Sequence, residues 1–127
     1  MLSRIGQVSI PVSDQDRAVA FYTEKLGCSL VMDQPMGESG ERWIEVALPE
    51  GETHLVLYGS PEQRERVMGS FSNIMFYSSD LAATHRALES RGVTIVQPPT
   101  TEFWGSYLIF ADPDGNSFLV SGPLKEA

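Results

Sequence analysis

The sequence predicts an α+β fold in which two βαβββ modules in tandem form a concave mixed sheet. An internal repeat carries the prediction: "QVSIPVSDQDRAVAFYTEKLG" from Gln7 and "NIMFYSSDLAATHRALESRG" from Asn73 share the order strand, acidic cap, helix, glycine. The turns "PEG" and "PDG" then write the same reversal near the end of each half. One module buries too little apolar surface alone, so two must share a core.

In the first half, residues 7–12 are rich in β-branched side chains and predict a strand. Ser13 or Asp14 offers a side-chain oxygen that caps a following helix. Its apolar stripe continues to Gly27, where the helix is expected to end. Three further strands are predicted at about 29–35, 42–48 and 53–58. The stripe consists of Ala18, Phe21, Tyr22 and Leu26.

The second half predicts the same elements in the same order. A strand at 73–77 leads to Ser79 or Asp80 as helix cap, and Gly92 ends the helix. Strands follow at 93–97, 105–111 and 117–121. Asp14 and Asp80 each lie seven residues after the first residue of their strand, so the two halves agree in register. The apolar stripe of this helix consists of Leu81, His85 and Leu88.

These elements predict a single domain over residues 1–127. Module one covers about 1–59, a connector with a short helical turn covers 60–70, and module two covers about 71–124. A chain of 127 residues, 42% apolar and 20% charged, is long enough for one core but not for two independent ones.

Composition also limits the partners. A net charge of −8 with scattered Lys and Arg repels nucleic acid. No run of the sequence is long and apolar enough to indicate a membrane span or an export signal. The single cysteine, Cys28, cannot form an internal disulfide and is expected to be a small buried apolar residue. A cytoplasmic protein is therefore expected.

Several motifs follow one another along the chain: the opening strand, Asp14 through "AVAFYTEKLG", the second-half strand and helix, and "DPDGN" at 112–116. Together they resemble the vicinal-oxygen-chelate superfamily. That superfamily includes glyoxalase I, extradiol dioxygenases, fosfomycin-resistance proteins and bleomycin-binding proteins. The resemblance spans nearly the whole chain and implies the glyoxalase/bleomycin resistance/dioxygenase fold. It also implies a homodimer, with sites completed by the two halves of one chain or of two chains.

The resemblance implies where a metal site would lie. In metal-dependent members the ligands come from corresponding strands of both halves, and the opening-strand positions fall here on Gln7 and Asn73. The carboxylate positions fall on Leu119 and on Leu55, or on Val56 after a one-residue slip. Two amides facing apolar residues carry too little charge to hold a divalent ion. We therefore expect no metal ligands and no cofactor.

Both histidines have a structural explanation. His54 neighbours Leu55 in a strand and should point to the opposite face. His85 lies on a helix that should pack outside the sheet. A non-standard metal site made of Glu45, Glu52 and His54 remains an open alternative.

The remaining chemistry of the predicted concave face is aromatic and amide. Residues two apart in a strand share a face, so alternate residues of the strands can line one cavity. Apolar walls with a few amides suit a flat or aromatic ligand, although the leucines would also serve to fill the core. The predicted ligand-binding residues are Gln7, Ser9, Trp43, Leu55, Leu57, Asn73, Met75, Tyr77, Phe103, Trp104, Tyr107 and Leu119.

The leading interpretation is a metal-independent small-molecule binding protein. The alternative is a divalent-metal-dependent lyase or isomerase like glyoxalase I, or an extradiol dioxygenase, with an altered ligand set. A third interpretation is a filled cavity and a protein that acts through its surface. The sequence assigns no catalytic residue, since Cys28 has no neighbouring base and no glycine-rich phosphate loop opens a helix. Whether the chain is an enzyme stays open.

Overall fold

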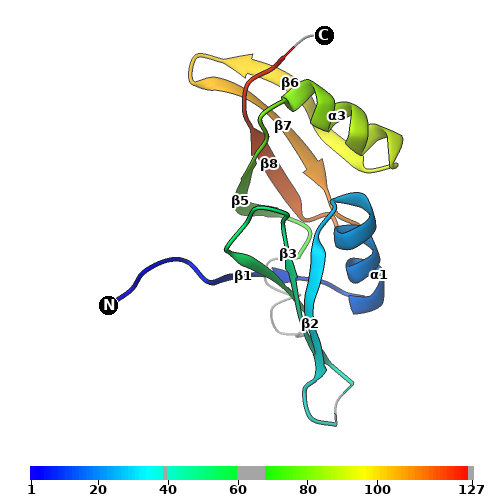
Figure 1. Cartoon of the computed structure of the whole chain (residues 1–127). Coiled ribbons are helices and arrows are strands. Elements are labelled where there is room, and N and C mark those ends of the chain that lie inside the picture. The colour runs from blue at the N-terminus through cyan, green and yellow to red at the C-terminus, as the bar shows by residue number, and fades with distance from the viewer. Residues whose placement is uncertain (39, 60–67, 126–127) are drawn as a thin grey trace. The chain divides into compact units, whose positions relative to one another are not determined.

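The computed structural model describes residues 1–38, 40–59 and 68–125 (Figure 1). Their contacts divide the chain into two compact units, Met1–Met68 and Gly69–Ala127, each with a helical segment and its own four-stranded mixed sheet. The predicted α+β fold with tandem modules is thereby confirmed, with two separate sheets. The helical turn expected in the connector at 60–70 falls mainly outside the described residues.

The first unit contains β1 (Gln7–Pro11), α1 (Gln15–Ala20) and a π-helical turn η1 (Phe21–Lys25). These are followed by β2 (Ser29–Pro35), β3 (Arg42–Ala47) and β4 (His54–Tyr58). The strand order is β1-β4-β3-β2. Strand β1 runs parallel to β4, whereas β3 is antiparallel to both of its neighbours.

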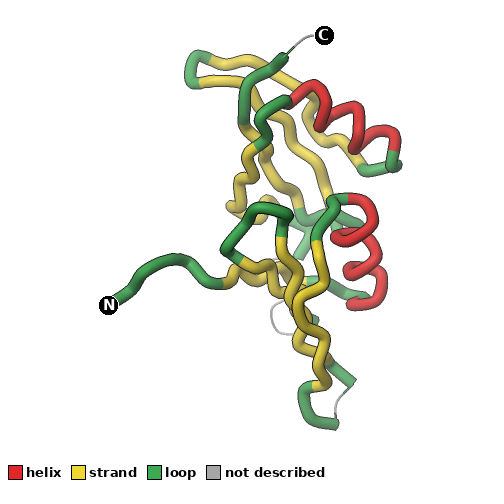
Figure 2. Tube along the Cα trace, in the orientation of Figure 1, coloured by secondary structure: helices red, strands yellow, loops and turns green. Residues whose placement is uncertain are grey.

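The second unit repeats this plan (Figure 2). It contains β5 (Phe71–Tyr77), α3 (Leu81–Ser90), β6 (Thr94–Glu102), β7 (Gly105–Ala111) and β8 (Ser117–Ser121) in the sheet order β5-β8-β7-β6. Strand β5 runs parallel to β8. The main difference from the predicted strands is β6, expected to end at 97, which continues to Glu102 through two prolines. An edge strand tolerates proline, and register shifts mark this stretch.

Helices α1 and α3 are each capped by the aspartate of the predicted pair rather than by the serine. The side chain of Asp14 accepts a hydrogen bond from the Arg17 amide at 3.0 Å, and that of Asp80 accepts one from the Ala83 amide at 3.1 Å. Gly27 and Gly92 have φ values of 78° and 76°, as their places after the helices predict. Within the described residues, no helix has the length and apolar character needed to span a membrane.

Each unit buries the sheet face that carries its helix. In the second unit, Phe76, Phe110 and Phe118 form a group of rings with centroids 5.4–6.1 Å apart. Cys28 is buried in the first unit, as expected, and burial raises the pKa of its thiol to about 11, which keeps it protonated and unreactive at neutral pH. The first unit further buries Ile10, Val12, Phe21, Tyr22, Ile44 and Leu57.

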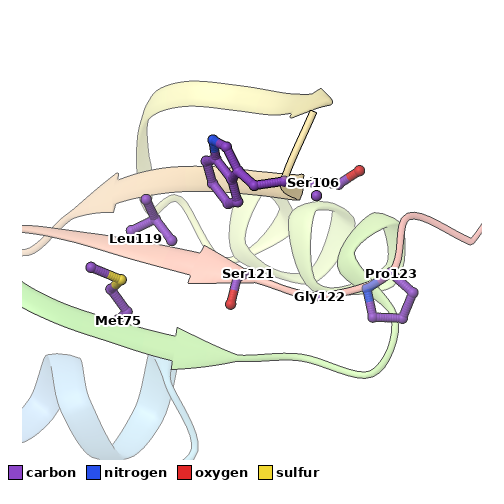
Figure 3. Close-up of a pocket in the computed structure, with 8 residues that line it drawn as sticks. Met75, Ser106, Leu119, Ser121, Gly122 and Pro123 are labelled. Atoms are coloured by element: carbon purple, nitrogen blue, oxygen red, sulfur yellow. The ribbon is translucent and has the colours of Figure 1, made fainter. Parts of the chain in front are cut away.

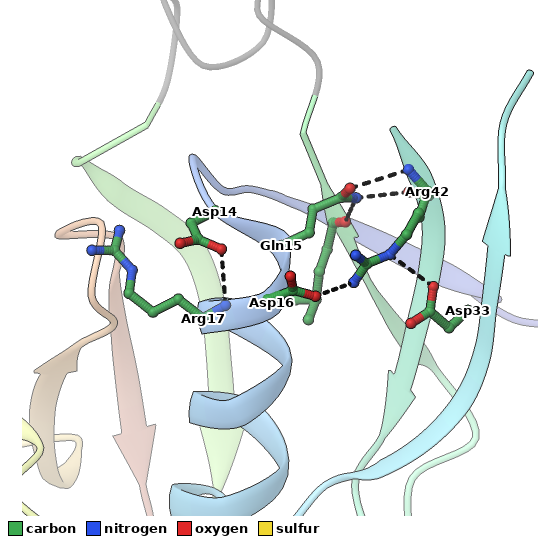
Figure 4. Close-up of polar contacts among 7 residues, drawn as sticks. Asp14, Gln15, Asp16, Arg17, Asp33 and Arg42 are labelled. Atoms are coloured by element: carbon green, nitrogen blue, oxygen red, sulfur yellow. Dashed lines mark hydrogen bonds and ion pairs between the residues drawn. The ribbon is translucent and has the colours of Figure 1, made fainter. Parts of the chain in front are cut away.

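The side chain of Gln15 joins α1 to the sheet of the first unit (Figure 4). Its Nε2 donates to the carbonyl oxygens of Arg42 and Leu57 at 2.7 and 3.0 Å, and its Oε1 accepts from the Arg42 amide at 3.1 Å. It therefore supplies partners to two strands at once. Beside it, the Arg42 guanidinium pairs with Asp16 and Asp33 at 2.7 and 3.0 Å near the surface.

We predict that Gln15→Ala lowers the free energy of unfolding by about 1–3 kcal/mol, because it leaves partly buried backbone groups without partners. The measurement is urea denaturation followed by circular dichroism. The control, Asp16→Ala, removes an exposed ion pair and should lower the free energy of unfolding by less than about 1 kcal/mol. Equal effects of the two substitutions would contradict the assigned role of Gln15.

Candidate functional site

The parallel register of β1 on β4 determines the open face of the first sheet. Gln7 pairs with His54, and Ser9 pairs with Val56. Neighbouring strands in register present paired residues on the same face, so these four side chains lie on one side. Strand β3 adds Glu45, which pairs with Val56.

Two expectations about this face were wrong. Leu55 and Leu57 pair with Val8 and Ile10 and are buried on the opposite face, so they do not line a cavity with Gln7. His54, expected to point away from such a cavity, lies on the side of Gln7. Both errors have one cause, because a one-residue shift in register moves every side chain of a strand to the other face. The register also places Val56, not Leu55, at the position where the family resemblance implies a carboxylate.

Glu45 is the centre of a polar cluster on this open face. Its side chain is only 8% exposed, and its carboxylate accepts hydrogen bonds from Trp43 Nε1 at 2.6 Å and from His54 Nδ1 at 2.8 Å. The hydrogen bonds from Trp43 and His54, with a smaller contribution from Gln7, lower the pKa of Glu45 and keep it ionised at neutral pH. Trp43 also lies edge-on to Tyr58, with ring centroids 6.4 Å apart.

The cluster is not the alternative metal site considered from the sequence. Glu52 is exposed and does not complete a set with Glu45 and His54: among the residues described here, no three His, Cys, Asp or Glu side chains are placed to hold an ion. His85 lies on α3, where it pairs with Glu89 at 3.4 Å. The part played by Glu45 could have been found from the sequence only with the correct strand register.

The second unit contains a pocket of about 570 Å³ on the open face of its sheet (Figure 3). Met75 pairs with Leu119, and Tyr77 pairs with Ser121, which confirms that Met75, Tyr77 and Leu119 share a face. The pocket is lined by Met75, Trp104, Gly105, Ser106, Leu119, Ser121, Gly122 and Pro123.

Trp104 is the aromatic residue that lines the pocket, and Tyr107 supports its ring without lining the pocket itself. Trp104 stacks on Tyr107, with centroids 5.2 Å apart and ring planes 24° from parallel. Phe103, also predicted to bind ligand, is fully exposed and does not line the pocket. Phe103 and Trp104 form the two-residue turn between β6 and β7, because the ladder closes with the pair Glu102 and Gly105.

Five lining residues were not among the predicted site residues: Gly105, Ser106, Ser121, Gly122 and Pro123. Ser121 had a sequence signal, since it lies two residues after Leu119 in one strand and must share its face. Gly122 had none. A side chain there would collide with the carbonyl oxygen of Ser78, so only backbone fits at this point of the pocket.

Asn73, matched to Gln7 by the repeat, has a different local structure. Its φ is 63°, and it lies where the β5–β8 register shifts between Phe71 and Met75. Asparagine tolerates this left-handed conformation better than other residues that carry a side chain. The backbone therefore explains the residue type without a ligand role.

We predict that Asn73→Ala lowers the free energy of unfolding by about 1 kcal/mol, whereas Asn73→Gly changes it by less than about 0.5 kcal/mol. Alanine opposes a positive φ and glycine accepts it. Thermal and urea unfolding of the two variants check the prediction. An alanine variant as stable as the glycine variant would contradict it.

We predict that Glu45→Gln lowers the free energy of unfolding by about 1–3 kcal/mol at pH 7, because the ionised carboxylate accepts charge-assisted hydrogen bonds. The lowered pKa means that this stabilisation is present above the unfolded-state pKa, near 4.5, and is lost as the pH falls through the folded-state value. The difference in the free energy of unfolding between wild type and variant should therefore become smaller below pH 4.5.

Denaturant unfolding between pH 7 and pH 3.5 measures that difference. Glu50→Gln, at an exposed position in the first hairpin turn, serves as the control and should leave the wild-type pH dependence unchanged. A difference that stays constant over the whole range would contradict the role given to the Glu45 carboxylate.

Comparison with known proteins relates this architecture to a family. A model of the Glyoxalase/Bleomycin resistance protein/Dioxygenase superfamily matches residues 4–120. The uncharacterized protein YetH of Bacillus subtilis is 36% identical over 122 residues, which cover 94% of this chain and 98% of YetH.

Two solved structures extend the comparison. A superfamily member from Sphaerobacter thermophilus has a TM-score of 0.84 and 31% identity, and the match covers 95% of this chain and 98% of that one. TnmS3, an antibiotic binding protein from Streptomyces sp. CB03234, has a TM-score of 0.83 and 33% identity, over 96% and 97% of the two chains. The chain therefore belongs to the glyoxalase/bleomycin resistance protein/dioxygenase superfamily, as its sequence resemblance implied.

Proposed function

We propose that this chain is a small-molecule binding protein that holds a flat aromatic ligand in the pocket of its second unit and needs no metal ion to do so. The observation that carries the proposal is the pocket of about 570 Å³ lined by Trp104, whose ring stacks on that of Tyr107. This volume lies within the usual range of small-molecule sites.

The lining of the pocket suits such a ligand. Trp104 and Leu119 offer apolar surface, and aromatic rings bind other rings through offset stacking. The hydroxyl group of Ser121 supplies a polar contact that can orient the ligand (Figure 3), whereas the hydroxyl of Ser106 is hydrogen-bonded to Thr101 at 2.9 Å. Apolar walls with a few polar groups are the common composition of ligand pockets.

The turn that carries Trp104 adds a second argument. Two-residue hairpin turns favour Asn-Gly and similar pairs, because their backbone needs positive φ values. Here the turn residues are Phe103 and Trp104, and neither has a positive φ. Trp104 is nevertheless 52% exposed beside the pocket. Neither turn formation nor core packing explains a tryptophan here, whereas ligand stacking does.

Metal independence is inferred from the available donor groups. Val56 and Leu119 occupy the positions where the family resemblance implies carboxylates, and neither side chain can bind a cation. Gln7 contributes to the hydrogen bonding of Glu45, and Asn73 has a backbone reason for its identity. These residues do not fit a divalent ion, so we assign no step to one.

The relatives support the same class of function. TnmS3 is an antibiotic binding protein, and it shares 33% identity with this chain over nearly the full length of both. We extend only the class, binding of a small organic molecule, to the present protein. The homodimer and the cytoplasmic location expected from the sequence stay predictions.

We predict that anthraquinone-2-sulfonate, a soluble flat aromatic probe, binds the protein and that Trp104→Ala weakens its affinity about tenfold or more, through loss of ring stacking. Isothermal titration calorimetry gives the affinity. At a probe concentration 100 times the dissociation constant, the folded state should gain about 2.7 kcal/mol, which is visible as a thermal shift.

The control is Phe103→Ala, which removes the neighbouring exposed ring and should leave the affinity unchanged. Elemental analysis of protein purified without chelators should find no stoichiometric nickel, zinc, iron or manganese. Equal losses of probe affinity in Trp104→Ala and Phe103→Ala would contradict the assignment of the binding site to this pocket. A stoichiometric ion removed by substitution of Gln7 or Asn73 would contradict metal independence.

A further inference from the structure

The Glu45 cluster belongs to the first unit and shares no residue with the pocket just described. Trp43 Nε1 and His54 Nδ1 approach different oxygens of the same carboxylate, at 2.6 and 2.8 Å. Gln7 contributes from β1. The three strands β1, β3 and β4 thus direct polar side chains toward one buried anion.

These contacts fix the proton on His54. Tryptophan can only donate, and an ionised carboxylate can only accept. The lowered pKa of Glu45 keeps its carboxylate ionised at neutral pH, so the short contact to His54 requires a proton on Nδ1. In the neutral imidazole, the other ring nitrogen, Nε2, is then a hydrogen-bond acceptor.

The Nε2 atom is available for an external partner. The His54 side chain is 32% exposed, and no residue in the described ranges provides a hydrogen bond to Nε2. The side chains that share its face on these strands are Gln7, Ser9 and Pro11 on β1, Val56 and Tyr58 on β4, and Trp43, Glu45 and Ala47 on β3. Glu45 is the only charged side chain among these residues, and its carboxylate is occupied by the donors named above.

A purely structural role does not explain this cluster well. A buried carboxylate has lost much of its hydration, and well-packed apolar residues of similar size usually stabilise a fold at least as much. The adjacent Val56 shows that apolar residues fit on this face. What the carboxylate provides and an apolar residue cannot is an imidazole held in one tautomer.

We propose that His54 Nε2 is a recognition site for a weakly acidic hydroxyl group on a planar aromatic molecule, such as a phenol, with Glu45 as the positioning residue. The hydroxyl donates to Nε2, and the edge-on pair of Trp43 and Tyr58 provides the neighbouring aromatic surface. This site involves no residue of the pocket in the second unit. It therefore stands or falls independently of the proposed function.

Long-range ¹H–¹⁵N NMR of the whole protein tests the proposal, with 1-naphthol as the probe and 1-methoxynaphthalene as its matched ether. Near pH 8, where an ordinary imidazole is neutral, His54 should show the Nδ1–H tautomer. 1-Naphthol should shift the His54 Nε2 resonance, and the ether, which has no proton to donate, should not. The other histidine, His85 on α3, is the internal control and should not respond to either compound.

Two variants separate the roles of the residues. His54→Asn keeps a short amide donor toward Glu45 but has no Nε2. This substitution should weaken binding of 1-naphthol about three- to tenfold and leave the affinity for the ether unchanged. Glu45→Gln should convert His54 to a mixture of tautomers and reduce the preference for 1-naphthol over the ether. The wild-type spectra provide the test even if a variant fails to fold.

The proposal is overturned if 1-naphthol does not shift the His54 Nε2 resonance or if both compounds shift it equally. It is also overturned if Glu45→Gln leaves the tautomer of His54 unchanged. Anthraquinone-2-sulfonate has no hydroxyl group, and its binding is measured through Trp104. Failure of the pocket and failure of the His54 site are therefore distinguishable results.

Discussion

The parallel pairing between the first and the last strand of each unit is the constraint on which both candidate sites depend. In the first unit it aligns Gln7 with His54, and in the second it aligns Met75 with Leu119. Each pairing decides which alternate residues face the helix and which face away from it. The site chemistry described above is a consequence of these two registers.

The two open faces have the same origin in topology and different chemistry. On the first, Glu45 and His54 build a hydrogen-bonded cluster. On the second, Trp104 and Leu119 build an apolar pocket with the Ser121 hydroxyl at its edge. A repeated βαβββ plan therefore fixes where side chains project, while the residue types at those places decide what can be bound.

Local signals in the sequence were enough for the fold. The repeat, the aspartate caps and the glycines after the helices predicted nearly every element, because each depends on hydrogen bonds within a few residues. The site depended on pairing between β1 and β4, whose residues lie more than 40 positions apart. Leu55 and His54 were assigned to the wrong faces for that reason. The left-handed backbone of Asn73 was not predicted, because a single residue of this kind inside a strand leaves no periodic signal.

The pocket of the second unit also shows how one fold can acquire new ligand selectivity with little loss of stability. Trp104 belongs to a two-residue tip beyond the last ladder pair, Glu102 and Gly105, so it contributes nothing to the strand hydrogen bonds. Substitutions at this tip change the surface that a ligand contacts, while the strands of the sheet keep their pairing. Chains that share this sheet can therefore diverge in their preferred compounds through changes at a single hairpin end, without endangering the ability to fold.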